Sequence, residues 1–178
     1  MRRFANYIIK LYWSRIKRSL NNLLKPRYQR NDGEIELKAR LNNGLYLERY
    51  GFKAYSQNDE DGIIEEIFNR IGTTNKIFVE FGVENGLESN SHYLLHKGWS
   101  GLWIDGSEKS VKEIKKLFKK PIYDNKLKVI NAFITKDNID SLISDNGNIN
   151  GEIDLLSIDI DGNDWWVWNA IKRIWVSY

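Results

Sequence analysis

The strongest constraint on the fold is a regular alternation, from residue 76 onward, of short apolar runs with amphipathic stretches. The apolar runs are rich in Ile, Val, Leu and Phe, which is typical of buried strands. Such an alternation predicts a Rossmann-like doubly wound α/β fold, with a parallel sheet and helices on both faces. The expected strands are 76–82, 101–107, 127–135 and 153–161, and the expected helices are 56–71, 88–97, 108–120, 136–144 and 163–175.

Size and charge narrow the class of protein further. The chain has 178 residues, 42% of them apolar, which is enough for the core of one α/β domain. Residues 1–31 hold nine of the 27 basic residues and none of the 24 acidic ones, so the rest of the chain is acidic. An acidic body is a poor partner for nucleic acid. Since there is no cysteine to form disulfides or thiolate metal sites, we expect a cytoplasmic protein.

The basic amino-terminal segment predicts an amphipathic helical extension at residues 1–34, followed by the domain at residues 35–178. Lys and Arg interrupt each of its apolar runs, so it is neither a signal peptide nor a transmembrane helix. Three placements stay open for it. It packs on its own domain, it lies through residues 1–25 on the anionic inner face of a membrane, or it binds a partner protein.

The helix that precedes the first strand has a predicted signal at each end. Ser56 is expected to cap it, with Asp59 at the capping-box position, and Gly72 is expected to end it. Apolar residues at helical spacing should form its buried face. These residues are Ile63, Ile64, Ile67, Phe68 and Ile71.

Polar residues stand after every predicted strand at its carboxyl end, where parallel sheets bind their ligands. They are Glu80 to Gly82, Asp105 to Ser107, Asn131 and Ala132, and Asp159 to Asp161. Gly82 and Gly86 allow a tight turn and a close approach of the backbone to a ligand. Asp105 lies 23 residues after Gly82, about where a nucleotide-binding domain has the carboxylate that accepts from ribose hydroxyls. The pattern predicts a site for an adenosine-containing cofactor.

Glu84 discriminates between such cofactors. It stands where the dinucleotide fingerprint has its second glycine, at the closest approach to a pyrophosphate. A carboxylate at that point repels phosphates, and Glu80 and Glu88 add to the negative charge. We therefore expect S-adenosylmethionine, which has no phosphate and carries positive sulfonium and ammonium groups, and we disfavour a nicotinamide cofactor.

Four segments between residues 55 and 171 resemble the FkbM-type proteins, a largely bacterial group of class I S-adenosylmethionine-dependent methyltransferases. The segments are FVEFGVENGLESNSHYLL, GWSGLWIDGS, INAFITKDNID and DLLSIDIDGNDWWVWNAI. In that family the acceptor is usually a hydroxyl group of a sugar or natural product. The resemblance therefore implies both a methyltransferase fold and oxygen as the methylated atom.

The resemblance also implies a role for each residue at the carboxyl ends of the strands. The first loop would hold the methionine part of the cofactor through Glu80, Gly82, Asn85 and Gly86. Asp105 would bind the ribose, and Asn131 and Ala132 would lie near the adenine. Asp159 and Asp161 would face the transferred methyl group, with Asp159 contacting the cofactor and Asp161 acting as the catalytic group.

The acids after the fourth strand leave three interpretations open. Asp161 and Gly162 form a turn before a helix capped by Asn163 or Asp164, or one acid is the general base, or the acids bind a divalent metal. We assign no metal ligand. His92 and His96 are one helical turn apart but lack a third ligand, so we expect packed or surface histidines.

A complete domain of this class has seven strands, whereas four are predicted here. We therefore expect a truncated sheet whose fourth strand is an edge open to pairing with a second copy of the chain. The aromatic segment after that strand supports this expectation, although burial of one helix against the sheet is the alternative. Its apolar residues are Trp165, Trp166, Trp168, Ile171, Ile174 and Trp175.

Together these features predict an S-adenosylmethionine-dependent methyltransferase that acts on an oxygen of a sugar, a glycan or a related metabolite. The alternative is a non-catalytic Rossmann-like module for binding or assembly, held at a membrane by its basic helix.

Overall fold

The computed structural model describes residues 42–176, and the chain divides between Arg49 and Tyr50 into two units. The described part of the first unit is a turn in which the Leu45 N–H donates to Asn43 Oδ1 (3.0 Å), followed by the 3-10 helix η2 (Leu47–Tyr50). The predicted helical extension lies outside the described residues. The domain boundary at residue 34 therefore stays a prediction.

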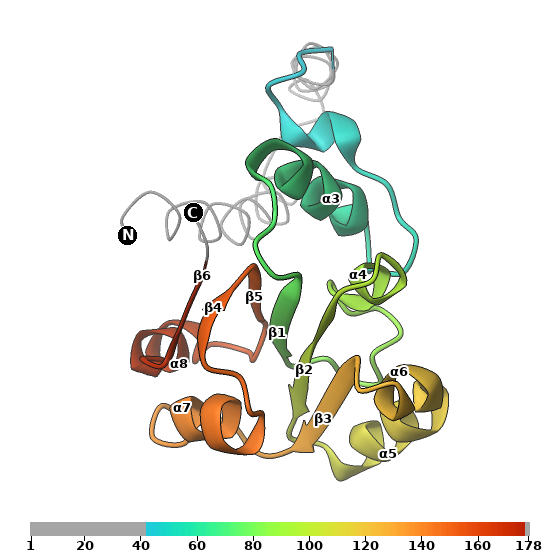
Figure 1. Ribbon diagram of the computed structural model, residues 1–178. Helices are drawn as coiled ribbons and strands as arrows, with labels where there is room; N and C mark the ends of the chain where they lie inside the picture. Colours follow the sequence, from blue (N-terminus) through green and yellow to red (C-terminus); the bar gives the residue numbers. More distant parts are fainter. Residues whose placement is uncertain (1–41, 177–178) are drawn as a thin grey trace, which may run out of the picture. The chain divides into compact units, whose positions relative to one another are not determined.

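The second unit is built on a parallel four-stranded sheet (Figure 1). The strand order is β3-β2-β1-β5, which is Rossmann-like and confirms the predicted fold class. Each of the four predicted apolar runs overlaps one of these strands, and β2 begins one residue before its predicted run. The strands are β1 (Ile77–Phe81), β2 (Ser100–Asp105), β3 (Leu127–Asn131) and β5 (Leu155–Ile158).

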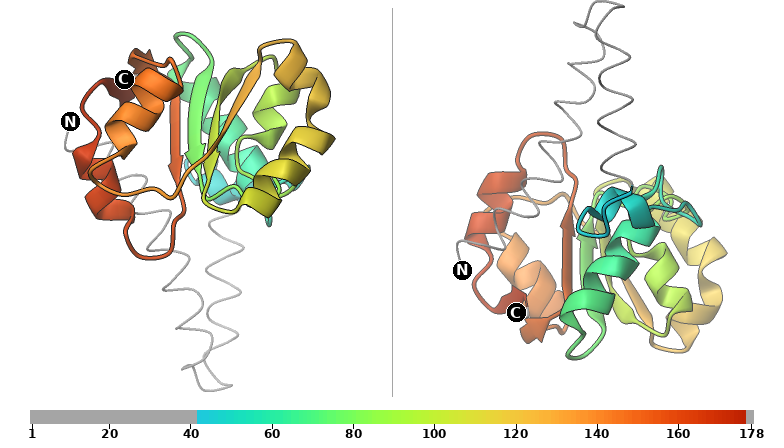
Figure 2. Two further views of the ribbon diagram at one scale, coloured as in Figure 1. Left: turned by 90° about the horizontal axis from the view of Figure 1, so that it is seen from below. Right: turned by 90° about the horizontal axis from the view of Figure 1, so that it is seen from above.

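Helices cover both faces of this sheet, as Figure 2 shows. The first face carries α3 (Glu60–Ile71), α4 (His92–His96), α5 (Glu108–Leu117) and α6 (Lys119–Tyr123). The opposite face carries α7 (Ile139–Ser141), its continuation as the π-helical turn η3 (Leu142–Asn146), and α8 (Asp164–Ala170). Within residues 42–176 no helix is both long enough and apolar enough to span a bilayer.

Alternate residues of each strand belong to separate cores on the two faces, because successive side chains of a strand point in opposite directions. Phe78 and Trp103 pack in the core under α4, α5 and α6, together with Leu94 and Ile114. Their strand neighbours pack with α7 and α8 instead. The buried members of that second core on β1 and β2 are Val79, Phe81, Leu102 and Ile104.

The start of α3 differs from the predicted capping box. Asp59 is the N-cap residue but its side chain makes no capping hydrogen bond. Ser56 Oγ instead accepts from the Asp61 N–H (3.2 Å), so the hydroxyl satisfies a donor of the first turn from five residues away. The other end is as predicted, since Gly72 comes directly after the helix with a φ of 81°. Ile71 is 44% exposed, so the predicted buried face is one residue too long.

The segment after β5 corrects two predictions. The helix expected over 163–175 ends at Ala170, and the chain becomes extended at Ile171. One cause is Asp140 Oδ1, which accepts from the N–H groups of Lys172 (2.7 Å) and Arg173 (2.9 Å) and so holds both amides outside a helix.

The next element is a further strand, β6 (Ile174–Val176), which pairs in parallel with β4 (Gly151–Ile153) (Figure 1). β4 and β6 form a second, two-stranded sheet, so the described residues contain six strands where four were predicted. In the four-stranded sheet β5 pairs only with β1, so it is the edge strand that the sequence predicted. Of the apolar residues in this segment, Trp165, Trp166 and Trp175 are 53%, 62% and 57% exposed, whereas Ile174 is buried in β6.

Asp154 separates β4 from β5. Its buried carboxylate accepts from three successive backbone N–H groups of the segment before β1, those of Thr74 (2.8 Å), Asn75 (3.0 Å) and Lys76 (2.6 Å). Its own N–H donates to Ile77 O (3.0 Å). This residue therefore joins the start of β1 to the junction of β4 and β5.

Replacing Asp154 by Ala should destabilise the domain by about 3 kcal/mol, because three backbone donors lose a charged acceptor that is itself buried. Chemical denaturation followed by circular dichroism measures the change. Asp137→Ala is the matched control, since Asp137 is exposed, and it should cost less than about 0.5 kcal/mol. Equal effects of the two substitutions would contradict the assigned role of Asp154.

Candidate functional site

The predicted site residues lie together at the carboxyl edge of the sheet. In the parallel register Phe81 is opposite Ile104 on one side and Ile158 on the other, and Asp105 is opposite Asn131. The loops that leave β1, β2, β3 and β5 therefore start next to one another (Figure 1). This edge is where ligands of open α/β sheets bind.

Glu80 is buried at the end of β1 and holds the loop that leaves this strand. Its carboxylate accepts from the backbone N–H groups of Asn90 (2.9 Å) and Ser91 (3.0 Å), from the Ser91 hydroxyl, and from the Ser157 hydroxyl on β5 (3.3 Å). Burial raises the pKa of the Glu80 carboxyl above its usual value, although these hydrogen bonds act in the opposite direction. Four donors surround this carboxylate, so its first role is to fix the loop.

Ser91 and Trp103 extend this contact to the next strand. The Trp103 indole N–H donates to Ser91 Oγ (2.8 Å), and the Trp103 side chain is completely buried. The Phe118 ring contacts the Trp103 ring edge to face, with 4.8 Å between centroids. The sequence prediction missed Ser91 and Trp103, because neither stands at the end of a strand.

Asp105 holds the two loops on either side of β2. Its Oδ2 accepts from the Glu84 N–H (2.8 Å) and its Oδ1 from the Ser107 N–H (2.8 Å). A carboxylate has about four lone-pair positions, so each oxygen keeps capacity for one more donor. Asp105 is 8% exposed, and the geometry permits it to accept from a ribose while it orders both loops.

Asn131 and Ala132 lie beside Asp105 at the end of β3. The Asn131 side-chain amide (3.0 Å) and the Ala132 N–H (3.0 Å) both donate to the backbone oxygen of Asp105. The Phe133 ring comes next and is 80% exposed, with Phe133 O accepting from Asn138 Nδ2 (2.9 Å). These bonds fix the turn that the sequence placed near an adenine.

The two glycines of the first loop approach parts of the protein itself. A side chain at Gly82, where φ is 71°, would clash with the backbone oxygen of Asp159. A Cβ at Gly86, where φ is 78°, would lie 2.5 Å from the Trp103 ring. The need for glycine at both positions is therefore explained by packing between loops and core.

Several amides of the first loop are bonded within the chain. The Gly86 N–H donates to Val83 O (2.8 Å), and the Leu87 N–H donates to Asn85 Oδ1 (3.1 Å). With the Glu84 N–H bonded to Asp105, three amides at the centre of the loop point at oxygens of this chain. Glu84 itself has a φ of 50° and is exposed. Three amides of the loop are therefore unavailable to a pyrophosphate, which binds to a cluster of free N–H groups.

The acids after β5 are arranged as a turn. Asp164 Oδ1 accepts from the Ile160 N–H (3.0 Å) and its Oδ2 from the Gly162 N–H (3.3 Å). Asp161, with a φ of 52°, lies exposed inside this turn, and Asp159 is exposed just before it. The turn predicted at Asp161 and Gly162 is therefore present, but the side chain of the N-cap residue Asn163 makes no capping hydrogen bond. Asp159 and Asp161 carry exposed carboxylates at the edge. Among residues 42–176 no three His, Asp or Glu side chains are arranged to hold a metal.

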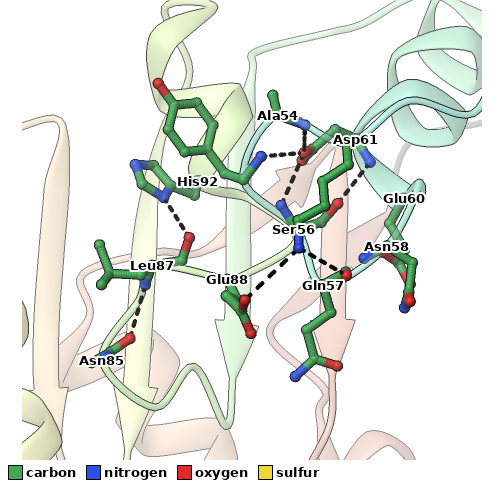
Figure 3. Close-up of polar contacts among 12 residues, drawn as sticks. Ala54, Ser56, Gln57, Asn58, Glu60, Asp61, Asn85, Leu87, Glu88 and His92 are labelled. Carbon is green, nitrogen blue, oxygen red and sulfur yellow. Dashed lines mark hydrogen bonds and ion pairs between the residues drawn. The ribbon is translucent and has the colours of Figure 1, made fainter.

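The segment before α3 lies against the first loop, which the sequence prediction did not anticipate (Figure 3). Asp61 Oδ2 accepts from the N–H groups of Ala54 (2.8 Å), Tyr55 (2.6 Å) and Ser56 (2.9 Å), which folds the segment into a tight turn. Lys53 Nζ donates to Gln57 O (3.0 Å) and is 3.9 Å from Glu88 Oε1 in the loop.

The two histidines belong to this same contact. The Tyr55 ring stacks on the rings of His92 (4.0 Å between centroids) and His96 (4.9 Å). His92 Nδ1 is 3.1 Å from Leu87 O, and burial lowers the pKa of His92. His92 is therefore a packed residue, and His96 is an exposed one stacked on Tyr55.

No protein-family model and no curated protein matches the chain. Seventeen solved chains are similar to it. One is the O-methyltransferase from Bacillus cereus in complex with SAH, at 14% identity and a TM-score of 0.45, over 88% of this chain and 68% of that chain. At this identity and TM-score the likeness carries no argument about chemistry, which rests on the geometry above.

Replacing Gly86 by Ala should destabilise the domain by about 3 kcal/mol for two reasons. The backbone at this position has a positive φ, which strains any residue with a Cβ, and the new Cβ would overlap the Trp103 ring. Gly98→Ala is the matched control. Gly98 also has a positive φ (82°) but open space around it, so it should cost only about 1 kcal/mol. Denaturation midpoints of the two variants separate overlap from backbone strain, and equal midpoints would contradict the packing role of Gly86.

The Glu80 carboxyl should give stability a specific pH dependence. Its pKa is raised in the folded protein, so its contribution is full below the ordinary value of 4.5 and is lost as pH rises through the raised pKa. Relative to Glu80→Gln, which cannot titrate, the native chain should lose free energy of unfolding as pH increases above about 4.5. Denaturation curves across that range test this, and a difference between the two proteins that does not vary with pH would contradict it.

Proposed function

We propose that the chain binds S-adenosylmethionine at the carboxyl edge of the sheet and is a methyltransferase of FkbM type. The observation that carries this proposal is the first loop, whose central amides donate to oxygens of the chain while the exposed Glu84 carboxylate faces outward. A pyrophosphate would find few donors and a repelling charge there. A cofactor with positive charge and hydroxyl donors matches such a loop.

Each predicted cofactor residue has a place in this proposal. Asp105 accepts from the ribose hydroxyls with the lone pairs that its backbone partners leave available. Asn131 and Ala132 border the adenine, and Asp159 lies at the reacting end. Glu80 positions the loop from below, and the turn formed by Gly82, Asn85 and Gly86 supplies the wall for the methionine part.

For the acceptor, we propose a hydroxyl of a sugar, a glycan or a related metabolite. Trp165 and Trp166 begin α8 directly after the turn that carries Asp161, and both are largely exposed. Flat indole faces with a polar N–H beside a carboxylate suit a ring that bears hydroxyl groups. Asp161 would remove the proton of the attacking hydroxyl, and methyl transfer needs little else beyond alignment of the acceptor with the sulfonium.

A second candidate is a non-catalytic module of the same fold for binding or assembly. It is favoured by the hydrogen bonds that already engage both Glu80 and Asp105 within the chain. This candidate predicts cofactor binding without turnover. Pairing of copies through the β5 edge and membrane contact through residues 1–25 belong to it as proposals.

Calorimetric titration with S-adenosylhomocysteine tests the proposal. The native chain should bind it, Asp105→Ala should weaken binding at least about tenfold, and NAD should neither bind nor compete. Asp124→Ala is the control, because Asp124 lies at the end of α6 and pairs with Lys120 (2.6 Å), away from the carboxyl edge.

A thermal unfolding transition must first show that each variant is folded. Binding of NAD in place of S-adenosylhomocysteine would overturn the cofactor assignment. Binding of S-adenosylhomocysteine without methyl transfer to any sugar hydroxyl would favour the non-catalytic module.

A further inference from the structure

A hollow of about 800 Å³ lies at the opposite edge of the sheet, where the strands begin. It is bordered by Ile77 at the start of β1, Gly101 in β2 and Leu127 at the start of β3. Apolar atoms make up most of its lining, including those of Ile122 from α6 and Ile149 from the segment before β4. Its place in the fold separates it from the proposed cofactor site.

Three lysines stand around this hollow. Lys115 on α5, Lys119 on α6 and Lys128 on β3 line it and are exposed. Two other lysines of the same helices have acidic partners, Lys112 with Glu108 (2.8 Å) and Lys120 with Asp124 (2.6 Å). Across residues 42–176 no carboxylate forms an ion pair with the three lining lysines. The hollow therefore has an apolar interior and an uncompensated basic rim.

Two exposed apolar side chains belong to the same helices as Lys115 and Lys119. Tyr123 lines the hollow and is 87% exposed, and Leu117 at the end of α5 is 54% exposed. Phe118 between them is buried in the core, which anchors both helices to the sheet. To bind a soluble polyanion, the lysines alone would be enough, and exposed apolar side chains would have no role. Lysines together with a protruding Tyr and Leu suit a surface that is anionic outside and apolar within.

We propose that this face, formed by α5, α6 and the start of β3, docks on a membrane surface that contains acidic phospholipid. The hollow takes the head of one such lipid, whose phosphate lies among Lys115, Lys119 and Lys128. Tyr123 and Leu117 enter the interfacial layer, while the lysine stems extend along apolar surface to keep their ammonium groups at the phosphates. The site is independent of the proposed methyltransferase activity and rests on different residues.

The absence of cysteine from the chain allows a direct test. In the full chain, Tyr123→Cys carries an environment-sensitive fluorophore as the only label, and Asn163→Cys, at the other edge, is the matched label position. With vesicles of phosphatidylcholine and phosphatidylglycerol, the emission at position 123 should shift to the blue, while that at position 163 should not. Vesicles of phosphatidylcholine alone should leave both unchanged.

Charge reversal then tests the rim. Changing Lys115, Lys119 and Lys128 together to Glu should raise the lipid concentration needed for the half-maximal shift by about tenfold or more. The control changes Lys109, Lys136 and Lys172 to Glu, which alters the net charge equally but leaves the hollow intact, and it should have a much smaller effect.

Three results would overturn the proposal. In the first, the emission of the label at position 123 does not shift although the chain sediments with anionic vesicles, which would assign membrane binding to another segment. The control triple variant weakens the shift as much as the rim variant does, which leaves only general charge. Heparin, a polyanion without an apolar part, reproduces the shift and prevents vesicle binding, which assigns the hollow to soluble polyanions.

Discussion

The geometry of the candidate site depends on the buried carboxylate of Glu80. It lies near the end of β1, just before the first loop, and it accepts the two backbone N–H groups at which that loop returns to α4. Because Ser91 also receives the Trp103 indole N–H, the same contact fixes the loop against β2. Without Glu80 the N–H groups of Asn90 and Ser91 would lose this partner, and the end of the first loop would lose the contact that fixes it to β1.

The same device occurs at three other buried acids. Asp61, Asp105 and Asp154 each accept from two or three backbone N–H groups of a connecting segment. Some of the acidic residues of this domain therefore serve to hold its connecting segments in place. An acid at the end of a strand is often taken for a ligand-binding residue, yet here it can order loops and still present lone pairs to a ligand, as Asp105 does.

The sequence predicted the sheet well, since each strand is a run of apolar residues bounded by polar ones. It also predicted which residues gather at the carboxyl edge, because that is a result of parallel strand direction alone. It could not predict the partners of the acids. Asp154 bonds to Thr74, 80 residues away, and only the folded chain brings the two together. The helix predicted over 163–175 was too long for a related reason. Trp and Val occur in α8 and β6 alike, and the contacts from Asp140 that separate the two elements are remote in sequence.

Trp103 also gives this molecule an internal optical reporter. Its indole is completely buried, donates to the loop hydroxyl of Ser91 and touches the edge of Phe118, so its electronic transitions are in a rigid, asymmetric surrounding. Trp99 is buried as well and contacts Phe68, whereas Trp165, Trp166 and Trp175 are exposed. Near-ultraviolet circular dichroism therefore weights the two buried indoles, and the Trp103 part of the signal reports the state of the first loop without any label. Fluorescence quenching by a solute in water selects the exposed tryptophans instead, and the two signals together distinguish ordering of the loop from events at α8.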